Sequence, residues 1–236
     1  MAPRLKVLPA ALAAVAVALL IAAIAVKSLI ASWIALPAGD ALERLRAGQP
    51  VTIQEARIAA TASYRAGRVF EPGRYNSDAA LAAGRLPEAE RRTALNGVAL
   101  PQLVDQALIA APASPHNWAR RASLQLARRD YAGARRSLET SLALGRFVPG
   151  LTVPRLGILF ALMRRAPDPQ LDVYFDEQIR IAAASEPAAL AGFVVQHAGA
   201  EGRAQRLLST DYMLYKPYLD NLIEVRRNQP QQGVGK

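Results

Sequence analysis

The first hydrophobic pattern along the chain is a continuous one, because the twenty residues 7–26 carry no charge. A helix rises about 1.5 Å per residue, so a helix of this length spans about 30 Å, the thickness of the hydrocarbon layer of a bilayer. A fold this small seldom needs so long an uncharged run in its core, which disfavours a buried helix. The pattern predicts one transmembrane anchor within residues 1–36.

Charges on either side of this run predict its orientation. Arg4 and Lys6 precede it, whereas Lys27 follows it and Asp40 and Glu43 come soon after. Basic residues flanking a membrane span tend to stay in the cytoplasm. We therefore expect a cytoplasmic N-terminus, with the chain after the anchor outside the cytoplasm.

A cleaved signal peptide is the alternative, because Ala23-Ile24-Ala25 resembles a cleavage site. The hydrophobic region of a signal peptide is usually shorter than this run. Apolar character also resumes over residues 28–36, where Trp33 suits the membrane interface. The anchor is the preferred interpretation, and both interpretations export the remainder of the chain.

From residue 37 onward, short stretches with helical periodicity are separated by Gly and Pro, and no sustained alternation indicates a strand. The chain is predicted to be all-α, with one exported helical domain over residues 37–227. Several starts carry a side-chain cap, for example Thr52 followed by Glu55. The predicted helices cover residues 40–47, 53–66, 77–83, 87–96, 101–111, 115–129, 131–144, 152–165, 169–184, 187–197, 202–208 and 212–227.

Two segments lack this periodicity. Residues 67–77, which include Arg68, Phe70, Arg74 and Tyr75, are predicted to form a packed loop, with a ligand-binding loop as the alternative. Residues 228–236 have no apolar face and are predicted to form a disordered tail.

Residues 117–144 contain two helical stretches around a turn at Asp130-Tyr131. They resemble a tetratricopeptide repeat (TPR), a helix-turn-helix unit with a period of 34 residues. The resemblance implies stacked helical hairpins in which small residues let paired helices approach and large ones fill the groove between them. The repeat-packing positions that it assigns are Trp118, Ala122, Tyr131, Ala134 and Leu138.

A second resemblance covers about residues 110–208, including APASPHNWARRA and SLALGRFVPGLTVPRLGILF. In overall texture this region is similar to small single-pass, repeat-containing accessory proteins of bacterial exopolysaccharide or O-antigen assembly. The similarity implies a helper in envelope polysaccharide biosynthesis or export, held in the inner membrane with its C-terminal domain in the periplasm. It carries across no catalytic residue.

Positive charge is concentrated in one part of the chain. The net charge is +10, and residues 112–165 hold ten basic and two acidic residues. A solvated surface is one explanation, and an anion-binding face is the other, because guanidinium groups pair bidentately with phosphate or carboxylate. Outside the cytoplasm the available anions are acidic glycans, lipid headgroups and acidic protein patches, and we expect no nucleic acid there. The candidate face consists of Arg120, Arg121, Arg128, Arg129, Arg135 and Arg136.

The chain lacks the residues that common catalytic and metal sites need. It has no cysteine and only two histidines, His116 and His197. This composition excludes thiolate sites and leaves little for a histidine-based one. No common nucleotide-binding, serine-hydrolase or zinc-protease motif occurs. We therefore predict no enzymatic activity, and no catalytic residue, metal or cofactor.

Two acidic residues still need an interpretation. Asp172 and Asp176 lie four residues apart, which in principle suits an acid–base pair. Arg180 continues the same spacing from Asp176, so a solvated ion-pair face is the preferred reading.

Apolar helical stripes give the remaining candidates a structural interpretation. His197 continues such a stripe and is expected to be a hydrogen-bonded core residue. Tyr212, Tyr215 and Tyr218 lead into an aliphatic run, so we expect them in the core or against a partner helix, although such rings also stack on sugars.

These patterns predict a membrane-anchored, TPR-like scaffold that acts by protein–protein interaction in bacterial envelope polysaccharide biosynthesis or export. The expected partners are the membrane and a protein of that machinery. The alternative is a binding module for an acidic glycan or an anionic membrane surface.

Overall fold

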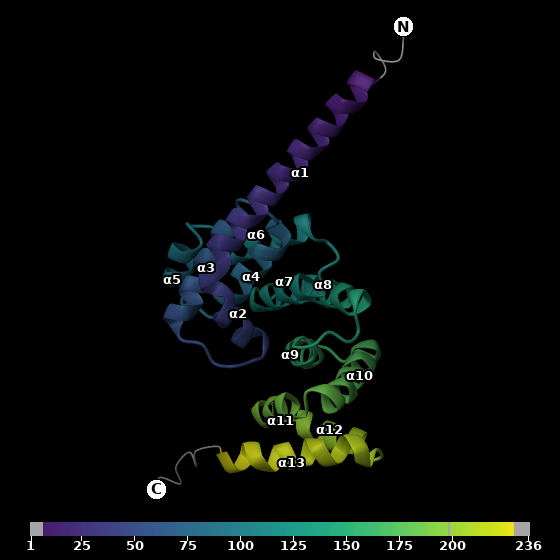
Figure 1. Cartoon of the computed structure of the whole chain (residues 1–236). Coiled ribbons are helices and arrows are strands. Elements are labelled where there is room, and N and C mark those ends of the chain that lie inside the picture. Colours follow the sequence, from purple (N-terminus) through teal and green to yellow (C-terminus); the bar gives the residue numbers. More distant parts are fainter. Residues whose placement is uncertain (1–6, 198, 229–236) are drawn as a thin grey trace. The chain divides into compact units, whose positions relative to one another are not determined.

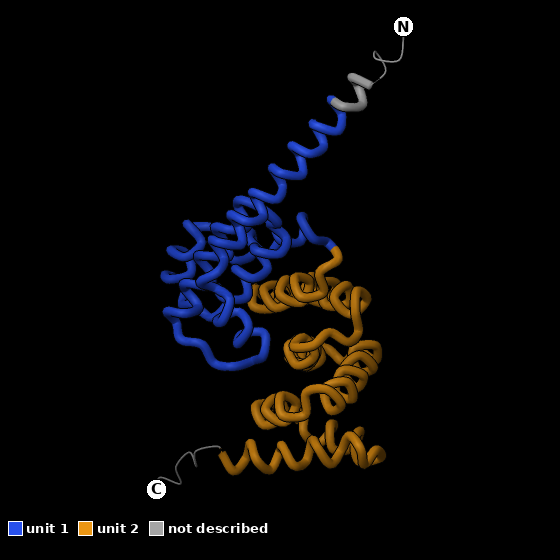
Figure 2. The backbone as a smooth tube through the Cα atoms, viewed as in Figure 1, with its two compact units in different colours: residues 1–112 blue, residues 113–236 orange. Residues whose placement is uncertain are grey.

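The computed structural model describes residues 7–197 and 199–228, and every regular element in these ranges is a helix (Figure 1). The all-α prediction is confirmed. The chain divides into two compact units, residues 1–112 and 113–236 (Figure 2), and a single exported domain over residues 37–227 stays a prediction. The first unit contains α1 (Val7–Ala35), a 3-10 turn (Leu36–Ala38), α2 (Gly39–Arg46), α3 (Ile53–Gly67), α4 (Pro72–Ala83), α5 (Glu88–Ala94) and α6 (Leu100–Ala110). The second contains α7 (Pro115–Ala127), α8 (Tyr131–Leu144), α9 (Thr152–Met163), α10 (Pro169–Ser185), α11 (Pro187–Gln196), α12 (Ala200–Leu208) and α13 (Tyr212–Asn228).

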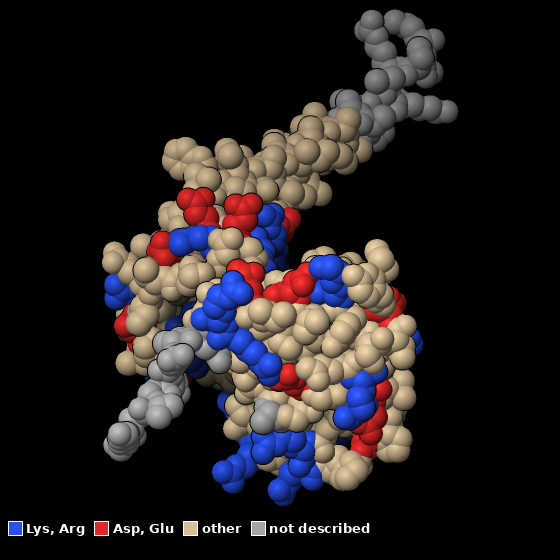
Figure 3. Space-filling view, turned by 90° about the horizontal axis from the view of Figure 1, so that it is seen from below, with Lys and Arg blue, Asp and Glu red and all other residues tan. Residues whose placement is uncertain are grey.

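The helix α1 is long and apolar enough to cross a membrane. Its large side chains are exposed, with Leu20 at 62% and Leu29 at 63%. On the face shown in Figure 3, the column that leads from the grey N-terminal residues carries no charged group until the packed helices begin. The exposure excludes the buried-core reading of this helix, and an anchor and a signal peptide both remain compatible with it.

The last turns of α1 pack against α3 and α4 of the same unit. Ala31 is fully buried in a small cluster with Ala66 of α3 and Tyr75 of α4. The hydroxyl groups of Ser32 and Tyr75 lie 3.5 Å apart. Because Ala31 has a short side chain, the helices can approach closely at this point.

Alanines form the contact between α3 and α4. Gly67 lies where the two helices are closest, since an added Cβ would be 2.6 Å from Asn76 Oδ1 and 3.2 Å from Tyr75 Cβ. The core of this helix pair therefore depends on close approach of the two backbones. Its fully buried alanines are Ala56, Ala59, Ala60, Ala66, Ala79, Ala82 and Ala83.

The start of α4 differs from the prediction. The helix begins at Pro72, so the loop predicted over residues 67–77 is wrong in its second half. Glu71 has a left-handed backbone, with φ at 46°, which turns the chain into the helix, and Pro72 suits the first helical position. Tyr75 is consequently a buried helical residue. Gly73 suggests a turn in the sequence, but in the structure it lets α4 approach Ala111 closely, because an added Cβ at Gly73 would lie 2.8 Å from Ala111 Cβ.

Most other helix starts follow their local signals. Thr52 Oγ1 accepts the N–H of Glu55 at 3.2 Å, and Glu55 Oε2 accepts the N–H of Thr52 at 2.8 Å, which confirms the predicted capping box. Side chains of Ser114 and Asp168 cap α7 and α10. Of the predicted tail, Asn228 ends α13, and residues 229–236 lie outside the described residues.

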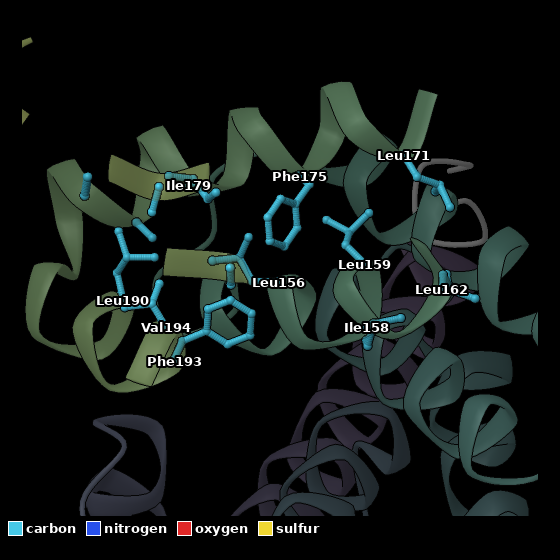
Figure 4. Close-up of a cluster of buried hydrophobic side chains, with 14 of the residues drawn as sticks. Leu156, Ile158, Leu159, Leu162, Leu171, Phe175, Ile179, Leu190, Phe193 and Val194 are labelled. Carbon is cyan, nitrogen blue, oxygen red and sulfur yellow. The ribbon is translucent and has the colours of Figure 1, made fainter. Parts of the chain in front are cut away.

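The second unit has a core of large side chains, shown in Figure 4, to which α9, α10 and α11 contribute. The ring of Phe175 lies 6.1 Å from that of Phe160 and 6.4 Å from that of Phe193. Phe175 and Leu159 are both at most 1% exposed. This core supports the helical hairpin that carries the arginine-rich sequence, because Leu138 and Leu142 of α8 belong to the same cluster.

Candidate functional site

The arginine-rich sequence folds into a hairpin of α7 and α8, joined by residues 128–130. Asp130 Oδ1 accepts the N–H of Gly133 at 2.9 Å and so caps α8. Arg129 has a φ of 63°, which closes the turn in a left-handed conformation. The turn is therefore fixed by a helix cap and a short connection, and its arginine side chains extend from this frame.

The residues assigned to repeat packing differ in burial. Ala122, Ala134 and Leu138 are fully buried, whereas Trp118 and Tyr131 are half-buried. The small residues thus lie inside the hairpin, and the aromatic ones keep part of their surface in solvent. A helical pair is present at residues 115–144, and the repetition of such a unit stays a prediction.

Three of the six candidate arginines make contacts within the hairpin or with a nearby helix. Arg120 donates to Asn117 Oδ1 at 3.0 Å, and the guanidinium of Arg121 lies 5.5 Å from the ring centre of Trp118. Arg135 forms ion pairs with Glu139, at 2.9 Å, and with Asp168. The hydrogen bond to Glu139 raises the pKa of Arg135. These three side chains have structural contacts that compete with an external anion.

The other three, Arg128, Arg129 and Arg136, form what we call the exposed arginine group. Their side chains are exposed, and no carboxylate of the described residues lies within ion-pair distance of them. Arg128 and Arg129 lie in the turn, and Arg136 lies in the second turn of α8. Nearby, the guanidinium of Arg165 lies 5.3 Å from the ring centre of Tyr131. The six-arginine anion-binding face stays a prediction, and within it the exposed arginine group has no carboxylate partner among the described residues.

Arg155 shows that not every arginine of residues 112–165 belongs to the basic surface. It contributes to the positive charge of residues 112–165, yet its side chain is fully buried. It donates to Ser141 Oγ at 3.1 Å and to the carbonyl oxygens of Gly145 and Arg146 at 2.8 and 3.1 Å. Burial lowers its pKa to about 10, so the guanidinium is still charged at neutral pH. Arg155 thus satisfies carbonyl groups at the end of α8, which have no partner within the helix.

The two aspartates of α10 bind an arginine that the sequence analysis did not single out. Arg203 of α12 donates from Nε to Asp176 Oδ1 at 2.6 Å, and its Nη1 pairs with Asp172. The hydrogen bond to Asp176 raises the pKa of Arg203. The predicted Asp176–Arg180 pair is wrong, because Asp176 pairs with a residue 27 positions away. Two carboxylates held by one cation form a structural contact between α10 and α12.

The aromatic residues of α13 divide between core and solvent. Tyr218 is fully buried, Tyr215 packs partly against the core, and Tyr212 is 69% exposed. Burial raises the pKa of Tyr218 to about 12. His197, which directly follows α11, is half-buried, and its Nδ1 lies 2.8 Å from the carbonyl oxygen of Phe193, which confirms a hydrogen-bonded structural histidine.

The residues that sequence analysis missed are those whose partners are distant in the sequence. Nothing near Arg203 indicates its pairing with α10, and the spacing of Arg155 is that of any surface arginine. A weak signal exists for Arg155, because it lies within the apolar run of α9, where a charged residue is expected to have buried partners.

Comparisons with known proteins were negative throughout. No protein-family model matches the chain, and searches of curated proteins and of solved structures found no match either.

Proposed function

We propose that this protein is a membrane-anchored helical scaffold that binds a partner protein through the exposed arginine group. The observation that carries the proposal is the combination of an exposed apolar helix with guanidinium groups that have no carboxylate partner among the described residues. Guanidinium groups pair well with carboxylates, so an acidic surface is the complementary partner. Anchoring restricts the search to the membrane plane and raises the effective concentration of the partner.

The pathway part of the proposal rests on the similarity of residues 110–208 to accessory proteins of bacterial polysaccharide assembly. In this proposal α1 is a signal-anchor with a cytoplasmic N-terminus, and both helical units lie in the periplasm. The TPR-like hairpin of α7 and α8 presents the exposed arginine group, and no catalytic step is assigned to the chain.

Cross-linking of the full-length protein in membranes, followed by affinity purification and mass spectrometry, tests this proposal. We expect recovery of a polymerase, flippase or export component. The triple variant Arg128→Glu, Arg129→Glu and Arg136→Glu should lose that component at least about tenfold, because each reversal replaces an attraction by a repulsion.

A charge-matched control is Arg180→Glu, Arg206→Glu and Arg227→Glu, three exposed arginines elsewhere in the second unit. It should retain the partner at the level of the unchanged protein. Equal recovery with both triple variants, or no enrichment of any envelope component, would contradict the proposal.

A second candidate function is binding of an acidic glycan, which the same unpaired guanidinium groups favour. It predicts that the full-length protein in detergent binds polygalacturonate at low salt and releases it as salt screens the charges. Absence of binding at low salt would exclude it, and recovery of glycan without any protein partner would make it the better assignment.

A further inference from the structure

A groove in the first unit lies where α1 meets α3. Two hollows meet at Ile34 of α1. One, of about 430 Å³, is lined by α1 side chains alone, Leu29, Ile30, Trp33 and Ile34. The other, of about 380 Å³, is bounded by residues around Pro37 and by α3, including Arg65. The groove therefore has an apolar part and a part bordered by a cation.

The direction of α3 places its C-terminal end towards the apolar part of the groove. Ala66, near the end of α3, packs with Ala31 of α1, whereas Ile58, two turns earlier, lies in the same hollow as Pro37. The two helices thus run in opposite directions. The segment after α3 stays close to this contact, because Val69 and Phe70 pack against the same cluster of Ala31, Ala66 and Tyr75.

Positive charge collects at this end of α3. Arg65 and Arg68 are exposed, and no carboxylate of the described residues pairs with either of them. Arg74 is also exposed, at 67% of its side chain, with Glu71 3.7 Å away. By contrast, Arg57 at the other end of the groove lies 3.9 Å from Glu90. Of the two arginines that line the groove, Arg65 therefore has no carboxylate partner among the described residues, and Arg68 follows it by about one helical turn.

The length of α1 sets the level of this groove in a bilayer. A helix of 29 residues spans about 43 Å. Residues 7–26 account for about 30 Å of this length, the thickness of the hydrocarbon core, and residues 27–35 extend about 13 Å beyond it. With residues 7–26 in the hydrocarbon, the last turns of α1 lie at the level of the headgroups, where Trp33 is a typical interfacial residue. Arg65 and Arg68 are then at phosphate level.

We propose that this groove binds one anionic phospholipid from the adjoining leaflet. Its phosphate pairs with Arg65 and Arg68, and its glycerol backbone and the first carbons of an acyl chain lie along Leu29 and Ile30, the residues of the groove nearest the hydrocarbon. One amphiphile suits both parts of the groove, because its apolar end fits the apolar part and its anionic headgroup fits the part bordered by Arg65. Lipids are also the molecules that surround a helix in a bilayer. The inference rests on the proposed membrane anchor and concerns a different surface from the exposed arginine group.

The test uses full-length protein in bilayer discs made of equal parts phosphatidylcholine and phosphatidylglycerol. Native mass spectrometry then counts the lipids that stay bound. We expect phosphatidylglycerol to be retained in preference. The double variant Arg65→Gln with Arg68→Gln removes both charges. It should reduce the preference for phosphatidylglycerol at least about tenfold, because each cation near an anionic leaflet contributes about fivefold and the two contributions multiply.

The matched control is Arg85→Gln with Arg180→Gln. Arg85 is exposed and follows the end of α4, ten residues after Tyr75, which contacts α1, and Arg180 is an exposed residue of the second unit. The control should retain phosphatidylglycerol as the unchanged protein does. An unchanged lipid preference in the Arg65 and Arg68 variant would overturn the inference, as would equal retention of both lipids by the unchanged protein.

Two further measurements show which part of the inference fails if the result is negative. In the first, displacement of the lipid by free glycerol phosphate would show a simple anion site and contradict the phospholipid assignment. Alkaline extraction tests the anchor independently. Release of the chain from membranes would contradict the anchor and this inference together, whereas retention without a lipid preference would contradict this inference alone.

Discussion

The α3–α4 pair of the first unit and the core of the second unit are filled by different side chains. The first packs α3 against α4 through alanines, with a close approach of the two helices at Gly67. The second fills its interior with large residues such as Phe175 and Leu159. Because small residues bury little area, the first core depends on the distance between backbones, and the second depends on filled volume. The first should therefore be sensitive to added atoms and the second to removed ones.

Removing a large side chain from the second unit should have the largest effect. Phe175→Ala is expected to lower the free energy of unfolding by about 4 kcal/mol, because it leaves a cavity among rings that cannot collapse fully. Val173→Ala on the same helix, where the side chain is 64% exposed, should change it by about 0.5 kcal/mol or less. Urea unfolding of the detergent-solubilised protein measures both, and similar values would contradict a volume-filled core.

The buried guanidinium should have the next largest effect. Arg155→Met removes the donors for Ser141, Gly145 and Arg146 and is expected to destabilise the protein by about 3 kcal/mol. The exposed Arg136→Met serves as the control and should change stability by about 0.5 kcal/mol or less. Thermal unfolding of both variants compares them, and an unaltered melting temperature for Arg155→Met would refute its role in satisfying the end of α8.

Adding one carbon atom at a glycine should change stability in opposite directions in the two units. Gly67→Ala is expected to destabilise the first unit by about 1–2 kcal/mol, because the new Cβ meets Asn76 and Tyr75. Gly157→Ala, at a helical position of the second unit with no atom within 4 Å, should stabilise by about 0.5–1 kcal/mol. Denaturation midpoints of the two variants should move in opposite directions, and a shift in the same direction would remove the proposed difference.

The contact between α10 and α12 should have a smaller effect. Arg203→Gln leaves Asp172 and Asp176 without their shared cation, and we expect a loss of about 1 kcal/mol, limited by solvent screening of the partly exposed groups. Arg180→Gln, the partner that local spacing suggests, should have almost no effect. Urea unfolding measures both variants. A larger loss of unfolding free energy for Arg180→Gln than for Arg203→Gln would favour the Asp176–Arg180 pair and contradict the role of Arg203.

The capping box in the first unit predicts a pH dependence. Hydrogen bonding to the Thr52 N–H, followed by that to Arg44, lowers the pKa of Glu55 from 4.5 to about 2. The contribution of Glu55 to stability is therefore fully present above pH 4.5 and is lost as the pH falls towards 2. Glu55→Gln should destabilise the protein at pH 7, with the difference from the unchanged protein shrinking below pH 4.5. A pH-independent difference would contradict this role.

Local signals predicted the fold well where the physics is local. The capping box at Thr52 and the cap at Ser114 depend on neighbouring residues, so the starts of α3 and α7 follow from sequence. The start of α4 does not, because Pro72 and Gly73 resemble turn residues until Ala111 is brought against them. The division into two units likewise depends on contacts distant in sequence.

The candidate site was only partly predictable for the same reason. Sequence identifies the arginine-rich segment, and the apolar run around Arg155 is only a weak sign that this arginine is buried while Arg128 is exposed, because the groups that pair with Arg155 are brought to it by the fold. Arg203 was missed since its carboxylate partners lie on another helix. Burial and long-range pairing therefore decide which guanidinium groups are left to bind a partner.

The most direct test of the anchored scaffold is the location of the second unit relative to the membrane. The chain has no cysteine, so Ser209→Cys introduces a single exposed thiol at the end of α12. Intact spheroplasts are treated with a membrane-impermeant maleimide, and the labelled protein is weighed by mass spectrometry. Our account predicts labelling without permeabilisation and a membrane-bound chain that keeps its N-terminal helix. Labelling only after permeabilisation, or a shortened soluble chain, would contradict it.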